Sequence, residues 1–146
     1  MMLWHFCPDF LLSAILREGL TKGRIAWTEN GHVHMRYGFQ WLTEDPDREK
    51  QAWCDPEYSS LPYDRAANRL TVVIPKESEV NLSRWMEAGP LIVASDQFRI
   101  LNAYGEPEKH WLYRGDIPPE WITSAEALGA RWKRPFRSDV AGSPAR

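Results

Sequence analysis

The sequence lacks the features that mark several large protein classes. Its 146 residues include only two cysteines, Cys7 and Cys54, whose spacing fits neither a disulfide framework nor a metal motif, so we expect two free thiols. No apolar run approaches the ~18 residues of a membrane-spanning helix. No basic region precedes an apolar stretch near Met1, as it would in a signal peptide. We therefore expect a cytoplasmic protein without a membrane partner.

The chain also lacks an excess of positive charge. Its 18 Lys and Arg residues are set against 20 Asp and Glu residues, which gives a formal net charge of -2. Tight binding to nucleic acid without sequence preference needs a basic field that displaces counterions from the phosphates. The charge balance therefore disfavours a nucleic-acid scaffold as ligand, whereas a local basic groove would still admit nucleic acid as a substrate.

Familiar catalytic motifs are missing too. The chain has no Gly-rich phosphate loop, no Gly-x-Ser-x-Gly elbow and no zinc-protease motif. What it does have is aromatic content, with eight Trp, five Tyr and five Phe. Disordered chains are poor in such residues, and this length suits one domain with a real core. We predict a single domain over residues 1–134 and a disordered tail over residues 135–146, which are rich in Ser, Ala, Gly, Pro and Arg.

The beginning of the chain predicts a strand followed by a helix. Leu3, Trp4 and Phe6 suit a buried strand, and Cys7-Pro8-Asp9 gives a helix start because proline and an acid favour the first helical turn. Apolar residues then recur at helical spacing. Gly19, with Leu20 after it, predicts a left-handed cap that ends this helix.

Residues 24–43 predict a hairpin followed by more extended chain. Asn30-Gly31 is a strong signal for a tight turn between strands over residues 24–28 and 32–37. Residues 39–43 continue as extended chain, and residues 44–63 are polar enough to predict a long loop with a helical turn at 48–53. Loops of that length are usually functional or mobile.

The rest of the chain predicts short elements. Residues 69–74 have the strongest strand pattern, and residues 111–113 form another strand. We expect short helices over residues 79–88 and 124–132, and extended pieces over residues 91–94 and 98–101. The resulting fold class is α+β, with a split or strongly curved, mostly antiparallel sheet, one N-terminal helix and short peripheral helices.

His5 is the first candidate functional residue. Strand alternation places it on the face opposite Trp4 and Phe6. An imidazole on a buried strand is unfavourable unless it has hydrogen-bond partners. His5 is therefore either a satisfied core or edge histidine or a site residue.

The first 20 residues also form a unit: a histidine strand, a short break, a helix and a Gly-Leu end (Leu3-Trp4-His5-Phe6, then Leu12, Ile15 and Leu16, then Glu18-Gly19-Leu20). This unit resembles the opening of the ADP-ribosyltransferase superfamily. The similarity is to the branch with a histidine on the first strand, which includes poly-ADP-ribose polymerases, tRNA 2′-phosphotransferases and DNA-modifying toxins of the DarT type. In that family the histidine contacts the nicotinamide-side ribose of NAD, so the resemblance implies this role for His5.

The resemblance implies two further elements. One is an aromatic residue that stacks on nicotinamide, and the segment from Tyr37 to Thr43 is similar, with Tyr37, Phe39 and Trp41 as candidates and Thr43 at its end. A flat cationic ring is well held against an aromatic face, although these aromatics equally suit a core. The other element is a glutamate at the start of a late strand, which stabilises the cation that forms as nicotinamide leaves.

Three residues lie near the expected place of that glutamate: Glu106, Glu108 and His110. Glu108 is the leading catalytic candidate, with His110 beside it, and the two glutamates also suit a solvated loop next to Pro107. If His110 rather than Glu108 faces the site, the usual carboxylate is missing. Transfer activity would then be in doubt, while NAD binding would remain possible.

Two arginines could hold the pyrophosphate of NAD. Arg65 and Arg69 flank a short segment before the strand over residues 69–74. A guanidinium recognises phosphate oxygens through paired hydrogen bonds. We take Arg65 as the cofactor-binding candidate, with a plain surface arginine as the alternative.

The leading hypothesis is an enzyme that transfers ADP-ribose from NAD to a macromolecular acceptor, either protein or nucleic acid, as a bacterial or phage effector or toxin would. The first alternative is a non-enzymatic interaction module that uses exposed aromatics, with residues 44–63 and 121–132 as its contact surface. A third possibility is a metal-dependent hydrolase built on His32 and His34, which lie on one strand face. Two solvated histidines are the simpler interpretation, and we assign no metal ligand.

Overall fold

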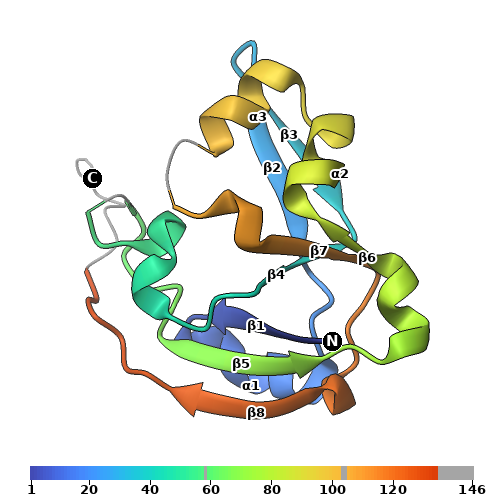
Figure 1. Cartoon of the computed structure of the whole chain (residues 1–146). Helices are drawn as coiled ribbons and strands as arrows, with labels where there is room; N and C mark the ends of the chain where they lie inside the picture. The colour runs from blue at the N-terminus through green and yellow to red at the C-terminus, as the bar shows by residue number, and fades with distance from the viewer. Residues whose placement is uncertain (58, 103–104, 135–146) are drawn as a thin grey trace.

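The chain folds around a central strand near its N-terminus. In the computed structural model (Figure 1), which describes residues 1–57, 59–102 and 105–134, β1 (Met2–Cys7) lies inside a six-stranded sheet. The strand order is β6-β7-β4-β1-β5-β8, and every neighbouring pair is antiparallel. The other strands are β4 (Phe39–Thr43), β5 (Asn68–Val73), β6 (Leu82–Arg84), β7 (His110–Arg114) and β8 (Ile122–Ala127).

The predicted helix after β1 is confirmed as α1 (Asp9–Glu18). Pro8 precedes it in an extended conformation, and Asp9 places a negative charge in the first turn. Gly19 ends the helix with φ +86°, and a Cβ there would come within 2.1 Å of the Ile117 carbonyl oxygen. Glycine is therefore required both by the left-handed backbone and by the close approach of the neighbouring chain.

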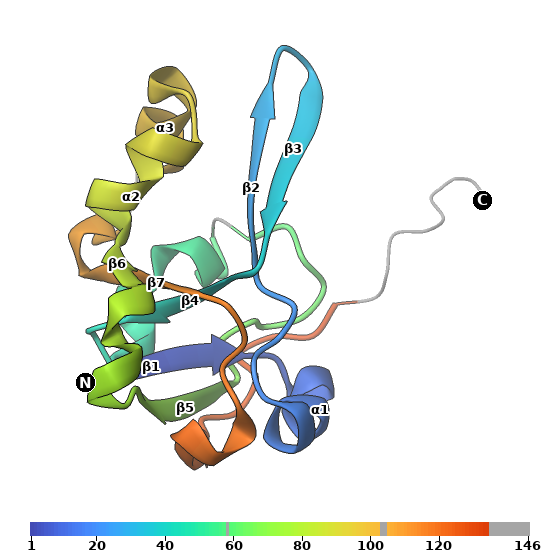
Figure 2. The ribbon, with the colours of Figure 1, turned by 90° about the vertical axis from the view of Figure 1, so that its right-hand side faces the viewer.

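The predicted hairpin is confirmed as β2 (Arg24–Glu29) and β3 (His32–Tyr37). Asn30 and Gly31 have φ values of 53° and 76°, as a tight turn with two left-handed residues requires. These two strands form a sheet of their own, which projects away from the six-stranded sheet beside α2 (Trp85–Ile92) and α3 (Ser95–Leu101) (Figure 2).

Two large clusters of buried side chains hold these parts together. The first joins α1 to the six-stranded sheet and includes Leu3, Leu42, Leu70 and Ile117. The second joins the hairpin and the two helices to β4 and β7. Its members and partly buried neighbours include Ile25, Trp85, Val93, Leu112, Trp27, Phe39, Trp41 and Phe98. The hairpin is therefore anchored through side chains rather than through a shared strand ladder.

The segment after β8 lies against the chain that follows the short 3₁₀ helices at Arg48–Lys50 and Ala52–Cys54. Arg131 donates hydrogen bonds to the buried carboxylate of Asp64 and to the carbonyl oxygen of Cys54. Trp132 donates to the carbonyl of Leu61, and Arg134 donates to the same carbonyl oxygen. Residues 131–134 thus hold down a segment distant in sequence.

Four sequence predictions of local structure were wrong in whole or in part. Residues 79–88 divide among a 3₁₀ helix (Lys76–Asn81), β6 and α2, instead of forming one helix. Of residues 91–94 and 98–101, expected to be extended, Leu91 and Ile92 end α2 and residues 98–101 lie in α3, where Phe98 packs on Trp85, whereas Val93 is extended as expected. Residues 124–132, expected to be helical, begin in β8, where the Ser124 hydroxyl donates to Thr71 across the sheet.

The α+β class and the mostly antiparallel sheet are confirmed. Residues 44–57 and 59–63 form the expected irregular segment with two short 3₁₀ helices, and 3₁₀ turns also occur at Pro107–Lys109 and Pro119–Trp121. Among the described residues, none of the helices has the length and apolar character that crossing a membrane would require. The predicted tail, residues 135–146, lies outside the described residues.

Candidate functional site

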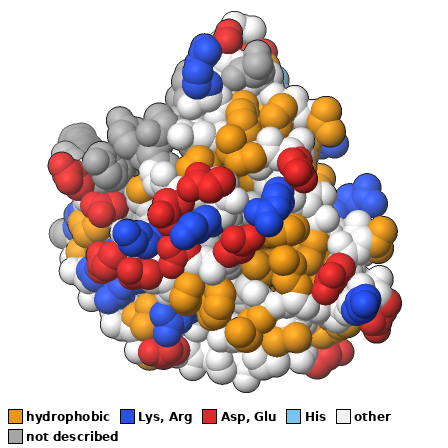
Figure 3. All heavy atoms as spheres, in the orientation of Figure 1, with side chains coloured by type: hydrophobic (Ala, Val, Ile, Leu, Met, Phe, Trp, Pro, Cys, Tyr) orange, Lys and Arg blue, Asp and Glu red, His pale blue; other side chains and the backbone are white. Residues whose placement is uncertain are grey.

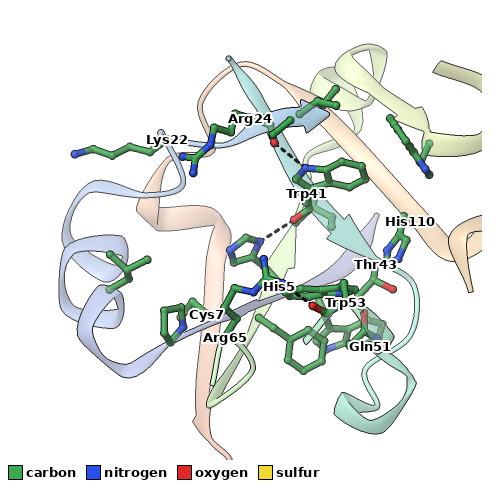
Figure 4. A pocket seen from close by; sticks show the side chains of 18 of the residues that line it. His5, Cys7, Lys22, Arg24, Trp41, Thr43, Gln51, Trp53, Arg65 and His110 are labelled. Carbon is green, nitrogen blue, oxygen red and sulfur yellow. Dashed lines mark hydrogen bonds between the residues drawn. The ribbon is translucent and has the colours of Figure 1, made fainter. Parts of the chain in front are cut away.

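A cleft opens where β1 and β4 part. The two strands share one paired position, Trp4 with Thr43, whereas β1 and β5 pair along the whole of Met2–Cys7. The cleft has a volume of about 560 Å³ and is lined from both sides of this gap. Its walls come from β1, α1, β2, β4 and the segment between Gln51 and Arg65, as Figure 4 shows. A volume of this size suits a small-molecule ligand.

His5 crosses the gap between the two strands. Its Nδ1 lies 2.7 Å from the carbonyl oxygen of Trp41 (Figure 4). A carbonyl oxygen can only accept, so Nδ1 carries the hydrogen and Nε2 of the neutral ring is left as an acceptor. This bond fixes the ring where the main-chain ladder between β1 and β4 has stopped.

Trp41 is held firmly on the other side of the gap. Its indole N–H donates to the carbonyl of Arg24 at 2.9 Å, and its ring meets that of Trp85 edge-on at 4.8 Å. The ring of His110 lies 6.1 Å from that of Trp41, also edge-on, and His110 pairs with Thr43 across β7 and β4. All four of Trp41, Trp85, His110 and Thr43 line the cleft.

Both cleft histidines favour the neutral ring. Burial lowers the pKa of His5, and the hydrogen bond to Trp41 offsets this only in part. Burial also lowers the pKa of His110, against a smaller opposing effect of the Glu108 charge. Each ring can therefore act as a hydrogen-bond acceptor or a proton acceptor near neutral pH.

The free energy of unfolding is expected to fall as the pH drops below the ordinary histidine pKa of about 6.5. His5 and His110 have lowered pKa values in the fold. Their stabilising contribution is therefore complete above the unfolded pKa and is lost as the pH falls through the folded pKa. Each histidine contributes at most about 1.4 kcal/mol per pH unit to the slope of the unfolding free energy against pH. Urea denaturation between about pH 5 and pH 8 measures this slope.

His5→Gln and His110→Gln should each flatten that dependence, and the exposed His32 gives a matched control as His32→Gln. A slope that both cleft variants leave unchanged would contradict the assignment of the pH dependence to these rings.

Cations line the cleft without carboxylates beside them. Lys22, Arg24 and Arg65 contribute to the walls, and no Asp or Glu is among the lining residues that the structure describes. A cleft with charge of one sign raises the local concentration of ligands of the opposite sign. This protein carries a net charge of -2, so the positive lining is local and favours an anionic ligand.

Cys7 also lines the cleft but offers no nucleophile. Burial, with a smaller contribution from the charge of Asp9, raises its pKa to about 11. The thiolate is the reactive form, and little of it exists at neutral pH with such a pKa. Covalent chemistry through this thiol is therefore disfavoured.

The structure brings together five of the eight residues that the sequence singled out as site residues: His5, Trp41, Thr43, Arg65 and His110. The other three lie outside the lining. Tyr37 is 69% exposed on β3, Phe39 packs in the second cluster, and Glu108 is exposed in the turn Pro107–Lys109. His110 rather than Glu108 thus faces the cleft.

The other charged candidates take part in local contacts. Arg69 donates to the carbonyl of Pro46 and forms an ion pair with Glu126 on β8. Glu106 lies 3.6 Å from the amine of Lys109 and does not line the cleft. Neither residue therefore contributes to the walls described above.

Sequence reasoning missed most of the lining, including Lys22, Arg24, Gln51, Trp53 and Asn102. Trp53 had a signal, since it is one of the few aromatics in the polar segment of residues 44–63, but that signal indicated an anchor or an interface. Gln51 and Asn102 gave none, because their role depends on contacts between distant segments. The Gln51 side chain, for example, donates to the carbonyls of Asp45 and Asp47.

The hairpin histidines lie away from the cleft. His32 and His34 are exposed on β3, and the ring of His34 stacks on Trp27 at 5.4 Å. Within residues 1–57, 59–102 and 105–134, no group of three His, Cys, Asp or Glu side chains could hold a metal ion. The described residues therefore contain no set of metal ligands that would support the metal-dependent hydrolase.

The cleft combines a gap between two strands, two neutral imidazoles, a fixed indole and three cations. No protein-family model, no curated protein and no solved structure matches this chain.

Proposed function

We propose that the cleft binds NAD and that the protein transfers the ADP-ribosyl group to a macromolecular acceptor. The observation that carries this proposal is the position of His5, which is fixed by the Trp41 carbonyl and presents an unprotonated Nε2 in a cation-lined cleft. Such a nitrogen can accept a hydrogen bond from a ribose hydroxyl. This is the role that the resemblance of the first 20 residues implies.

The other lining residues suit the remaining parts of NAD. The face of an indole holds a flat cationic ring well, so Trp41 is the residue for nicotinamide among the three aromatic candidates. The pyrophosphate is doubly charged, and Arg65 can bind its oxygens through paired hydrogen bonds. Tyr37 and Phe39 have no part in this arrangement because they lie outside the lining.

His110 stands where the resemblance implies a glutamate. It is the first residue of β7, it lines the cleft, and Glu108 is exposed two residues earlier. A neutral imidazole can take a proton from an acceptor hydroxyl or amine, but it stabilises a developing cation less than a carboxylate does. Binding is therefore the better-supported half of the proposal, and slow transfer is expected.

The proposal includes a split or strongly curved sheet. The single pair between β1 and β4 supports it, because a ligand could then lie between the two halves of the sheet. The separate hairpin also supports it, since β2 contributes Arg24 and Ala26 to the cleft wall.

The acceptor in this proposal is a protein or a nucleic acid. Acidic and basic side chains lie next to one another on the face shown in Figure 3, with hydrophobic groups between them. A face of mixed sign offers no broad field for phosphates. Acceptor contacts would therefore be local, near the cleft mouth.

The rival function is a non-enzymatic interaction module. All six residues of β3 are exposed, including Val33, Met35 and Tyr37, and exposed apolar groups of this kind often mark contact surfaces. In this case the cleft would bind no NAD, and His5 would be a structural residue that joins two strands.

Calorimetric titration with NAD tests the proposal. Wild-type protein should bind, His5→Ala should bind at least about tenfold more weakly after loss of one hydrogen bond and its positioning, and His34→Ala should match wild type. A folded wild-type protein that does not bind NAD would reject the proposal in favour of the interaction module. Equal binding by His5→Ala would remove His5 from the site.

A further inference from the structure

Arg65 is a cation without an anionic partner. It lines the cleft, is half-buried, and has no carboxylate within ion-pair distance among the described residues. Within the described part of the chain, only Nη2 donates to the protein, to the carbonyl oxygen of Trp53. The Nε–H is shielded from solvent and has no acceptor among the same residues. Burial lowers the pKa of Arg65, as expected for a cation that has lost water.

Such an arrangement is unfavourable unless an anion completes it. A buried charge normally has a partner, and a shielded donor without an acceptor loses the hydrogen bond that water would give. An anionic oxygen at the exposed edge of the guanidinium would supply the missing counter-charge and would accept hydrogen bonds from the N–H groups of that edge. The structure therefore holds an arginine in a state that a ligand would stabilise.

Trp53 makes this arrangement specific. The guanidinium carbon of Arg65 lies 4.8 Å from the centre of the Trp53 ring, so the arginine is stacked on the indole. The indole N–H donates to Gln51 Oε1 at 3.1 Å, and Gln51 itself is 2% exposed and bound to two carbonyls. Trp53 is nevertheless 39% exposed, so a fixed aromatic surface remains next to the arginine.

We propose that Arg65 and Trp53 form a subsite for a nucleoside 5′-diphosphate, with the phosphates on Arg65 and the base on Trp53. The planar guanidinium group matches the geometry of phosphate oxygens. Stacking on an indole stabilises any of the nucleobases. Lys22 and Arg24 add positive charge to the same cleft, which favours a multiply charged anion over a single carboxylate.

This subsite rests on the proposed function only in that NAD contains such a nucleotide. It makes a separate claim: ADP binds on its own, and His5 is not needed for it. Arg65 and Trp53 belong to the segment between β4 and β5, whereas His5 and Trp41 belong to the facing strands. The nicotinamide end and the nucleotide end of the ligand thus depend on different parts of the chain.

Calorimetric titration with four probes tests the subsite: ADP, inorganic pyrophosphate, adenosine and citrate. Wild-type protein should bind ADP more tightly than pyrophosphate, and it should bind both of these probes more tightly than citrate. Arg65→Lys should lower the affinity for ADP and for pyrophosphate by about tenfold each, because a lysine keeps the charge but cannot form the paired hydrogen bonds. Trp53→Leu should lower the affinity for ADP by about tenfold and the affinity for pyrophosphate by clearly less.

The chain offers matched controls. Arg17→Lys changes an exposed arginine that already has Glu18 as a partner, and Tyr37→Leu removes an exposed aromatic outside the cleft. Both should bind all probes like wild type. His5→Ala should bind ADP like wild type, even where it loses NAD.

Each outcome separates the two proposals. NAD binding without ADP binding would overturn the subsite and leave the proposed function intact. ADP binding without NAD binding would overturn the proposed function and leave the subsite intact. Citrate that binds as tightly as ADP, or Trp53→Leu that weakens ADP and pyrophosphate equally, would show a general anion site and overturn the assignment to a nucleotide.

Discussion

Replacing Asp64 with alanine is expected to lower the free energy of unfolding by about 3–5 kcal/mol, the effect of leaving one partner of a buried ion pair alone. The Asp64 side chain has no exposed surface. Its two oxygens accept from Nε of Arg131 at 2.9 Å, from Nη2 of Arg131 at 3.1 Å, and from the main chain of Ala66 and Arg131. Urea denaturation, monitored by tryptophan fluorescence, measures this change in the free energy of unfolding.

The pH dependence of Asp64 gives a second measurement. Burial alone would raise its pKa, but the hydrogen bonds from Arg131 and Ala66 outweigh burial and hold the pKa below its ordinary value. The stabilisation is therefore present above the unfolded pKa of about 3.9 and is lost as the pH falls through the lower folded pKa. The difference between wild type and Asp64→Asn should shrink over that acidic range.

Asp96→Ala is the matched control, because Asp96 pairs with Arg99 on the surface and both side chains are more than 80% exposed. It should change the free energy of unfolding by less than about 1 kcal/mol. A loss of similar size in Asp64→Ala would show that the buried pair contributes no more than a surface pair.

Replacing Trp85 with alanine is expected to lower the free energy of unfolding by about 3–5 kcal/mol through loss of a buried ring. Trp85 is 2% exposed, meets Trp41 at 4.8 Å and Phe98 at 5.1 Å, and donates to Asn102 Oδ1 at 2.6 Å. It thus joins α2 and α3 to β4. Chemical denaturation measures the stability, and amide exchange of β2 and β3 reports whether the hairpin loosens first.

Two variants of the same helix calibrate this result. Trp85→Phe keeps a ring and loses the bond to Asn102, so it should be destabilised by less than the alanine variant. Leu91 is 87% exposed, and Leu91→Ala should leave stability within about 0.5 kcal/mol of wild type. If Trp85→Ala were no worse than Leu91→Ala, the second cluster would not hold the hairpin.

The parts of the fold that the sequence predicted correctly are those with local signals. Pro8 and Gly19 mark the two ends of α1, and Asn30-Gly31 determines the hairpin turn through backbone conformation alone. His5 stands out as a site candidate in the same local way, because it is an imidazole among apolar strand residues, and the structure places it in the lining of the cleft.

The parts that could not be predicted depend on distant partners. Ala125, Glu126 and Ala127 favour a helix by intrinsic propensity, yet they lie in β8 because β5 offers an open edge for pairing. Trp53 reaches the cleft because Arg65 stacks on it and Gln51 orients it, and neither contact leaves a pattern in the sequence. Glu108 and His110 are two residues apart, and His110 faces the cleft because β7 begins there, whereas Glu108 remains in the turn Pro107–Lys109.

The contacts of residues 131–134 also bear on how the protein is made. A ribosome delivers β1, α1 and His5 before the other walls of the cleft, and these elements can form while synthesis continues. The wall that holds Trp53 and Arg65 follows, but its ties to Arg131, Trp132 and Arg134 come more than 60 residues later still. A nascent chain therefore has the histidine strand long before it has a complete cleft, and the cleft wall is fixed only once residues 131–134 have been translated.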